Sequence, residues 1–370
     1  MKIAIWGKSL KIKQKTGLEI YTSNIIKYLI KNGANNQYTI LVDKNLKTGF
    51  CNNNCKVKVL KWPLRFLWTQ IKVPFELSNN EYDVAFFPSF TVPLFSKVKK
   101  VVVIHDCFVF DFPSHYSWFD RMSFRFWIKI SLKRAKILIV PSNYVKNKIV
   151  KYFPQSKNKI KVVYLGYEPV FRLASKSKIK IVKNKYKIKF DYFVHVVGGF
   201  VARKNTELVI LAFKKFLEKY PQVRLVVIGR EFGPEYNKIH NLVKDLDIES
   251  SIMFLSYIST KDVACLLSGS IASLYPSLSE GFGLPIIESM ASGSPVITSN
   301  MGAMKEIAED AAILVNPYKE QEIFAAMKKI YLNKRLHQQY KKIGVARARL
   351  FSWEKCAQET SALFEKLGAK

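Results

Sequence analysis

The residues best suited to chemistry in this chain are two glutamates that flank a glycine-rich turn. In the stretch SLSEGFGLPIIESMASGSPVITSN, residues 277–300, Glu280 directly precedes the turn and Glu288 lies beyond it. Apolar runs on both sides predict strand, turn, helix and strand, and Pro285 stands where the helix would begin. The N–H groups and positive dipole end of such a helix suit phosphate or sugar oxygens, and the carboxylates would hold hydroxyls on either side. The alternative is a neutral turn that carries two surface glutamates.

A glycine pair followed by two cations forms a second candidate binding loop. The predicted strand at 192–197 runs into Gly198 and Gly199, and Arg203 and Lys204 follow just before a predicted helix. Arginine offers a planar fork of donors and lysine a compact charge, which together suit a diphosphate. The sequence therefore predicts an anion-binding loop at this strand end.

One histidine follows a strand where a parallel sheet would place a ligand-binding side chain. The apolar run at 101–104 predicts a strand, and His105 and Asp106 come at its carboxyl end, the edge at which open α/β sheets bind ligands. A lone histidine is more often a structural residue, so the residues alone leave both interpretations open. His195 lies inside an apolar run and is expected in the core.

The elements that would position these residues alternate between strands and helices. A strand at 2–6, a loop that ends at Gly17, a helical pattern at 18–30 and a strand at 38–42 predict a first βαβ unit. A length of 370 residues favours two domains, so we predict an α/β protein with two Rossmann-like domains. The predicted division is a first domain at 1–170, a basic linker at 171–190, a second domain at 191–350 and a C-terminal helix at 351–370.

Positive charge dominates the composition, with 60 Lys and Arg against 28 Asp and Glu and a net charge of +32. Such a chain attracts polyanions, anionic lipid surfaces and phosphorylated small molecules. A lysine-favouring composition is an equal alternative. The segments at 60–77 and 118–136 are basic and aromatic, which suggests that the first domain docks on an anionic membrane surface. Nucleic acid is not an expected partner, because no recognition helix, zinc finger or aromatic RNA-binding motif is recognisable.

Cysteine usage indicates a reducing, cytoplasmic compartment, since the chain has five cysteines and only Cys51 and Cys55 are close in sequence. No paired histidines complete a metal-binding set. Asp245 and Asp247 could hold a divalent ion in another setting, but they lie at the polar end of a helical pattern and are interpreted as surface residues. No apolar run reaches the roughly 18 residues that a membrane span needs, so we expect any membrane contact to be peripheral, on the inner leaflet.

The motif EGFGLPIIE, the RKN triplet at 203–205 and the stretch HDCFVFDFPSHYS that begins at His105 resemble the retaining nucleotide-sugar glycosyltransferases of family 4. The resemblance extends over almost the whole chain. It implies the GT-B fold, in which two Rossmann-like domains face each other across a cleft and a C-terminal helix crosses back to the first domain. It also implies that the nucleotide sugar is a substrate and that neither a metal nor a cofactor is required.

The resemblance assigns roles position by position. Glu280 would contact the donor sugar, Glu288 would hold the ribose hydroxyls, and Arg203 with Lys204 would hold the leaving diphosphate. His105 would belong to the active-site loop of the first domain. The implied catalytic residues are His105, Arg203, Lys204 and Glu280, and the implied donor-binding residues are these last three with Gly17, Gly199, Tyr257, Gly281, Phe282, Gly283, Leu284 and Glu288.

Two positions depart from the pattern of the family. Many members carry an arginine where this chain has Gly199, so Arg203 is expected to bear more of the diphosphate charge. Lys305 stands where a proline is usual.

The resemblance implies an enzyme, a hexosyltransferase that acts in cell-surface polysaccharide biosynthesis. The first expectation is transfer of mannose from GDP-mannose, with retention and without a metal, onto a glycan or lipid-linked acceptor. A UDP- or dTDP-sugar donor is the alternative. A non-catalytic nucleotide-sugar-binding subunit would carry the same binding residues, although His105, Glu280 and Lys204 are intact. A phosphorylase of the same fold would need a much longer chain and a cofactor lysine.

Overall fold

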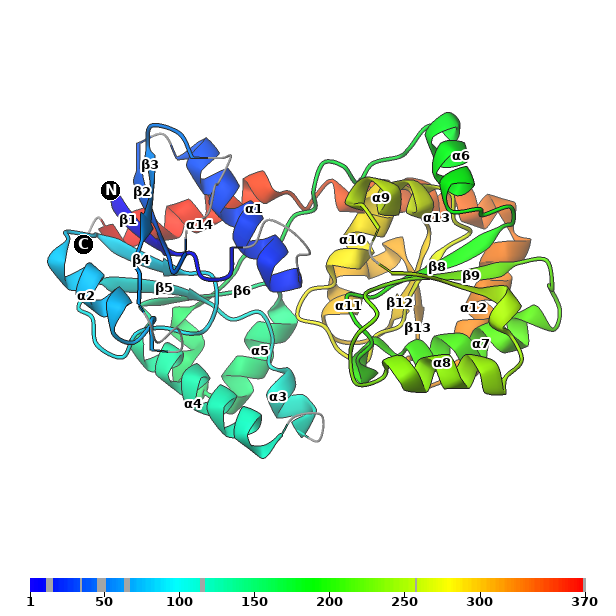
Figure 1. The fold of residues 1–370 in the computed structure, drawn as a ribbon, viewed down its shortest axis with the longest axis horizontal. Helices are drawn as coiled ribbons and strands as arrows, with labels where there is room; N and C mark the ends of the chain where they lie inside the picture. The colour runs from blue at the N-terminus through cyan, green and yellow to red at the C-terminus, as the bar shows by residue number, and fades with distance from the viewer. Residues whose placement is uncertain are drawn as a thin grey trace. The chain divides into compact units, whose positions relative to one another are not determined.

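The computed structural model describes residues 1–10, 16–33, 35–44, 51–62, 67–113, 117–256 and 258–368. The chain forms two compact units. Unit 1 comprises Met1–Gly166 and Ser352–Lys370, and unit 2 comprises Tyr167–Phe351. Figure 1 shows a sheet covered by helices in each unit.

Unit 1 contains a seven-stranded parallel sheet with the strand order β3-β2-β1-β4-β5-β6-β7. Most of its strand residues are buried, as expected when helices cover both faces of a parallel sheet. The strands are β1 Lys2–Trp6, β2 Gln37–Val42, β3 Cys55–Val59, β4 Val84–Phe87, β5 Lys99–Val103, β6 Ile137–Val140 and β7 Ile160–Val162. The helices are α1 Gly17–Asn32, α2 Lys72–Asn79, α3 Phe108–Asp111, α4 Trp118–Arg134, α5 Asn143–Tyr152 and α14 Trp353–Gly368.

The last helix, α14, completes the core of unit 1 beside α1 (Figure 1). Its Phe364 contacts Phe86 of β4, with ring centroids 5.3 Å apart. The returning chain passes so close to Gly166 that a Cβ there would lie 2.1 Å from the backbone nitrogen of Trp353. The expected return of the C-terminal helix to the first domain is therefore confirmed.

Unit 2 contains a six-stranded parallel sheet with the order β10-β9-β8-β11-β12-β13. Its strand order changes direction between β8 and β11, so the loops after these two strands start side by side. The strands are β8 Tyr192–Val196, β9 Arg224–Ile228, β10 Ile252–Leu255, β11 Ser273–Tyr275, β12 Val296–Ser299 and β13 Ile313–Val315. The helices are α6 Lys176–Lys185, α7 Thr206–Leu217, α8 Tyr236–Asp245, α9 Thr260–Ser268, α10 Leu284–Ala291, α11 Gly302–Ala308, α12 Glu320–Leu332 and α13 Lys334–Ala348.

Alternate residues of the unit 2 strands enter two apolar cores. Phe193 and Val227 belong to the core that α7, α8 and α12 share, whereas Val194 and Val226 belong to the core beneath α9, α10 and α11. This alternation follows from the period of two in a β-strand, and it anchors the strands whose carboxyl ends carry the candidate residues.

The expected basic linker at 171–190 is wrong, because most of this segment forms a helix of unit 2. In α6, Val182 is buried, and Lys185 bonds to Asp262 of α9 at 2.7 Å. Ile179, Val182 and Tyr186 recur at helical spacing, a signal that the seven lysines of the segment obscured.

Two sequence interpretations concern surface loops. The structure pairs Cys51 with Cys55, the first residue of β3, in a disulfide, whereas the cysteine usage indicated a reducing compartment. Cys107, Cys265 and Cys356 are free. Asp245 and Asp247 are exposed at the end of α8, as expected for surface residues.

Candidate donor-binding site

The glycine turn of the candidate site forms as predicted between β11 and α10. Gly283 has a φ of 99° and stands at the N-cap of α10, a backbone conformation that glycine adopts without steric cost. Pro285 lies in the first turn of the helix. The ring of Phe282 is buried against Phe351, with centroids 5.8 Å apart, so this residue has only its backbone to offer a ligand.

Glu280 gathers three donors on one oxygen. Its Oε1 accepts hydrogen bonds from Nη1 of Arg203 at 2.9 Å, from Nζ of Lys204 at 2.6 Å and from the hydroxyl of Tyr275 at 3.0 Å. Nζ of Lys204 also donates to the Tyr275 hydroxyl at 2.5 Å. Within the described residues no hydrogen bond reaches Oε2 of Glu280, so this oxygen can accept from a ligand hydroxyl. The structure thus brings together three of the predicted catalytic residues.

Hydrogen bonds to backbone carbonyls fix the loop after β8 against the loop after β11. The amide of Leu278 donates to the carbonyl of Arg203 at 2.8 Å. Asn205 adopts a left-handed conformation with a φ of 59°, and its side-chain amide donates to the carbonyls of Pro276 and Pro317. The side chains of Arg203 and Lys204 are therefore fixed relative to Glu280 before any ligand arrives.

Burial and charge set the ionisation of this cluster. Burial alone would raise the pKa of Glu280, but the charges of Lys204 and Arg203 outweigh it and lower the pKa. Burial lowers the pKa of Lys204, with the attraction of Glu280 as the main opposing effect. Burial and the Glu280 charge raise the pKa of Tyr275, which therefore stays a phenol. Glu280 is thus a carboxylate whose two cationic neighbours attract a further anion.

Glu288 lies half-buried on α10 and differs from Glu280 in its surroundings. Its carboxylate forms no hydrogen bond or salt bridge with any residue that the structure describes. Burial, reinforced by the nearby carboxylate of Glu168, raises its pKa to about 8, although Lys204 partly opposes this shift. A carboxyl group held without a partner beside a glycine turn is available to ligand hydroxyls.

His105 is in unit 1 and follows the carboxyl end of β5. Its Nε2 lies 2.8 Å from the carbonyl oxygen of Pro88, which can only accept, so Nε2 carries the proton. The Tyr21 ring packs edge-on against the imidazole at 4.6 Å. Burial lowers the pKa of His105 to about 4, so the ring is neutral and its Nδ1 is an acceptor.

The remaining predicted residues differ in how the structure constrains them. Gly17 opens α1, and a Cβ there would meet no atom within 4 Å, so packing alone does not require glycine. A Cβ on Gly199 would lie 2.9 Å from the ring of Phe232, so this ring occupies the space that the arginine usual in the family would need. Gly281 and Leu284 lie in the turn and at the start of α10. Tyr257 lies outside the described residues.

Two residues near the cluster were missed by the sequence analysis. Tyr275 is the last residue of β11, and a hydroxyl at the carboxyl end of an apolar strand could have signalled its role. Glu168 is remote from Glu288 in sequence, so no local pattern pointed to their proximity. His195 is fully buried between Leu274 and Thr206, which confirms the expectation of a core histidine.

Within the described residues, no group of three or more His, Cys, Asp or Glu side chains is arranged to hold a metal ion. Among the helices in the same part of the chain, none combines the length and apolar character needed to cross a bilayer.

Comparisons with known proteins agree with this geometry. The family model described as Glycosyltransferase Family 4 matches residues 15–170, and the model described as Glycosyl transferases group 1 matches residues 177–347. The chain belongs to glycosyltransferase family 4. It is a glycosyltransferase, and the second match covers every member of the Glu280 cluster.

Curated relatives of this glycosyltransferase include two bacterial enzymes. The O-antigen chain mannosyltransferase RfbU of Salmonella typhimurium is 29% identical over 294 residues, which cover 79% of this chain and 76% of the relative. The O-antigen chain mannosyltransferase B of Escherichia coli is 26% identical over 271 residues, 73% of this chain and 71% of the relative.

A solved structure supports the fold. Anabaena Alr3699/HepE, crystallised with UDP and glucose, has a TM-score of 0.79 and 19% identity, with 99% of both chains covered. The glycosyltransferase therefore has two Rossmann-like domains of the GT-B type.

The raised pKa of Glu288 predicts a pH-dependent stability. Between its ordinary pKa of 4.5 and its folded value of about 8, the native state retains a proton that the unfolded chain has lost. Stability contributed by this group is therefore full below pH 4.5 and is lost as the pH rises through 8. We expect Glu288→Gln to remove this loss, so that its melting temperature relative to wild type increases from pH 6 to pH 9. The melting temperatures are measured by thermal unfolding. If the difference between the variant and wild type stayed the same from pH 6 to pH 9, the raised pKa of Glu288 would be contradicted.

The Glu280 cluster predicts strong coupling between its members. Removing one partner of a buried ion pair costs about 3–5 kcal/mol, because the other charge stays buried. In a double-mutant cycle, the free energies of unfolding of Lys204→Met, Glu280→Gln and the double variant are measured in urea. The double variant should be about 1–3 kcal/mol more stable than the summed losses of the two single variants predict. The exposed pair Lys238 and Glu207, 2.6 Å apart, is the control and should couple by less than about 1 kcal/mol. If the losses in unfolding free energy at Lys204 and Glu280 were additive, the two residues would not stabilise each other as proposed.

Proposed function

We propose that this glycosyltransferase is a retaining, metal-independent hexosyltransferase that moves mannose from GDP-mannose onto a glycan or lipid-linked acceptor in cell-surface polysaccharide biosynthesis. The observation that carries the proposal is the shared Oε1 of Glu280, which holds Arg203 and Lys204 at the start of α10. Two cations and a helix N-terminus at the switch point of a parallel sheet form a site for a diphosphate.

The chemistry follows from where charge develops. When the bond between the sugar and the diphosphate breaks, negative charge grows on the leaving phosphate oxygen, and Arg203 with Lys204 stabilise it. Oε2 of Glu280 accepts a sugar hydroxyl, and Glu288 accepts the ribose hydroxyls. The leaving phosphate takes the proton of the acceptor hydroxyl, so that the new bond forms on the same face of the sugar. This step requires no carboxylic acid of the glycosidase kind.

The first domain contributes His105. As a neutral imidazole with its Nε2–H committed to Pro88, it accepts a hydroxyl hydrogen bond through Nδ1. A neutral ring at this position orients a hydroxyl without adding a further cation.

The names of the relatives support mannose as the transferred sugar, since both are O-antigen chain mannosyltransferases. A UDP-sugar is the second candidate for the donor, because the structural relative Alr3699/HepE was crystallised with UDP and glucose. A non-catalytic binding subunit is the less favoured alternative, because His105, Lys204 and Glu280, which are proposed to act in catalysis, are all present.

We further propose that unit 1 docks peripherally on the anionic inner leaflet of the cytoplasmic membrane. The exposed face of α4 carries Phe119 and Phe126, which are 78% and 54% exposed, with several basic side chains on the same helix. On α2, Phe75 is 61% exposed beside Lys72. Aromatic rings among lysines and arginines suit the boundary between anionic headgroups and acyl chains.

The donor proposal is tested by binding of GDP, UDP, dTDP and their sugar conjugates, measured by calorimetry in EDTA. One nucleotide family should bind, and Glu288→Ala should weaken it about tenfold or more, because the ribose hydroxyls lose the carboxyl oxygens that accept from them. Glu218→Ala, which removes an exposed glutamate of the same unit, is the matched control and should bind as wild type. Absence of nucleotide binding would refute the proposal, and binding that needs added manganese would refute metal independence.

The membrane proposal predicts that the protein sediments with vesicles containing anionic lipid at about 0.15 M salt, where screening is moderate. Each basic side chain near the surface is worth about 1 kcal/mol, and the phenylalanines add apolar burial. Phe119→Ala with Phe126→Ala should reduce the bound fraction severalfold. Tyr318→Ala with Leu332→Ala, which removes exposed apolar groups from unit 2, should leave it unchanged. Equal sedimentation with neutral vesicles, or none with anionic ones, would refute docking through this charged face.

A further inference from the structure

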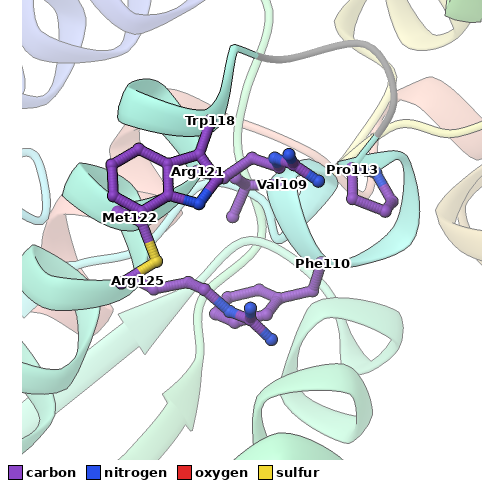
Figure 2. A pocket seen from close by; sticks show the side chains of 7 residues that line it. All are labelled: Val109, Phe110, Pro113, Trp118, Arg121, Met122 and Arg125. Carbon is purple, nitrogen blue, oxygen red and sulfur yellow. The ribbon is translucent and has the colours of Figure 1, made fainter.

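A cavity of about 340 Å³ opens between α3 and α4 in unit 1. Figure 2 shows the side chains that line it, with the guanidinium groups of Arg121 and Arg125 among aromatic and aliphatic groups. The volume is at the lower end of the range of small-molecule sites. The lining residues include Phe110, Pro113, Trp118, Arg121, Met122 and Arg125.

The apolar wall of this cavity is rigid where it meets α5. The Phe110 ring stacks on Tyr152 at 4.7 Å and meets Phe153 edge-on at 5.8 Å. The guanidinium of Arg125 lies over the same ring, 5.6 Å from its centroid. Trp118 and Met122 remain 60% and 48% exposed on the opposite side. A hydrocarbon chain that lay along these groups would bury surface that is now in water.

The two arginines of the cavity have no carboxylate partner in the described residues. Arg121 has a buried Nε without a hydrogen-bond partner, and neither Arg121 nor Arg125 forms a salt bridge in the described part of the chain. The neighbouring carboxylates are engaged elsewhere. Asp111 pairs with Lys148 at 2.6 Å, and Asp120 accepts from Ser117 at the N-cap of α4 at 2.7 Å. A buried guanidinium nitrogen without an acceptor costs free energy, which an anionic ligand would recover.

The spacing of the arginines indicates the kind of anion. Arg121 and Arg125 are four residues apart on α4 and therefore lie on the same side of the helix. Two planar forks one turn apart match the oxygens of a diphosphate better than a single carboxylate. The adjoining Trp118, Met122 and Phe110 then favour an apolar group attached to that anion.

We propose that this cavity binds the diphosphate of a lipid-linked acceptor and the first part of its hydrocarbon chain. The inference rests on the proposed function, because it names the carrier to which the acceptor glycan is attached. The place in unit 1 is suitable, since α3 begins three residues after His105, the residue proposed to orient the acceptor hydroxyl. Arg121 and Arg125 would fix the charged end of the carrier while the glycan extends to the reacting centre.

The test measures binding of geranyl diphosphate, inorganic pyrophosphate and geraniol to the full chain by calorimetry. Geranyl diphosphate should bind at least about tenfold more tightly than either half alone, because the cavity offers charge and apolar surface together. Arg121→Gln with Arg125→Gln should weaken this binding by about tenfold or more. Lys129→Gln with Lys133→Gln removes the same charge from the same helix beyond the cavity and should weaken it less than about twofold. Equal losses in the two double variants would overturn the site, because general attraction of the basic helix would explain them.

Two further arms separate the possible sources of the signal. Saturating nucleotide should leave the binding of geranyl diphosphate unchanged, whereas competition would show that the probe occupies the donor site and would overturn the proposal. The variant with Arg121→Gln and Arg125→Gln is called the cavity variant. This variant and the control with Lys129→Gln and Lys133→Gln should sediment equally with vesicles that contain anionic lipid but no prenyl diphosphate. A specific loss in the cavity variant would assign the site to membrane headgroups instead. Nucleotide binding without any binding of geranyl diphosphate would refute this inference and leave the proposed function standing.

Discussion

The interaction on which the donor site depends is the convergence of Arg203, Lys204 and Tyr275 on a single oxygen of Glu280. Two cations held close together in a buried loop would repel each other, and Glu280 offsets that repulsion before a ligand is present. The arrangement also limits how tightly the cations bind Glu280, because one oxygen serves all three donors. A diphosphate could therefore share the cations without removing the carboxylate from its place, and the second oxygen of Glu280 would remain available to a ligand hydroxyl.

This cluster exists because of the topology of the sheet. Arg203 and Glu280 are remote in sequence, but β8 and β11 are neighbours in unit 2, and the loops after them leave the sheet at the same edge. The left-handed conformation of Asn205 and the positive φ of Gly283 turn the chain sharply on both sides of the cluster. The packing of the core residues of β8 and β11 therefore positions the candidate site, since it fixes where the loops that carry Arg203 and Glu280 begin.

Sequence patterns predicted those parts of the site that depend on local chemistry. The glycine turn, the start of α10 at Leu284 and the alternation of strands and helices follow from residue types and spacing. A shared site for Arg203, Lys204 and Glu280 could be inferred only from the resemblance, because no local rule brings residue 203 to residue 280, and Tyr275 was missed. The proximity of Glu168 to Glu288 was not predictable for the same reason. The helix α6 was missed because its lysines dominated the interpretation, although Val182 and its apolar neighbours carried the helical period.

The net charge of +32 comes from cationic residues in different surroundings, which the composition alone could not distinguish. The structure separates those at the surface from those with buried cationic groups. Lysines such as Lys185 of α6 lie at the surface and pair with a carboxylate. A fold tolerates extra lysines at such positions without any role for them in ligand binding. Lys204 is different, because burial lowers its pKa and its position is set by Glu280. Arg121 differs again, since its buried Nε has no acceptor in the described residues. Compositional bias places charge on solvated surfaces, where it costs little, so the buried Lys204 and the buried Nε of Arg121 require a different explanation. The binding of anionic ligands that we propose for both sites would supply it.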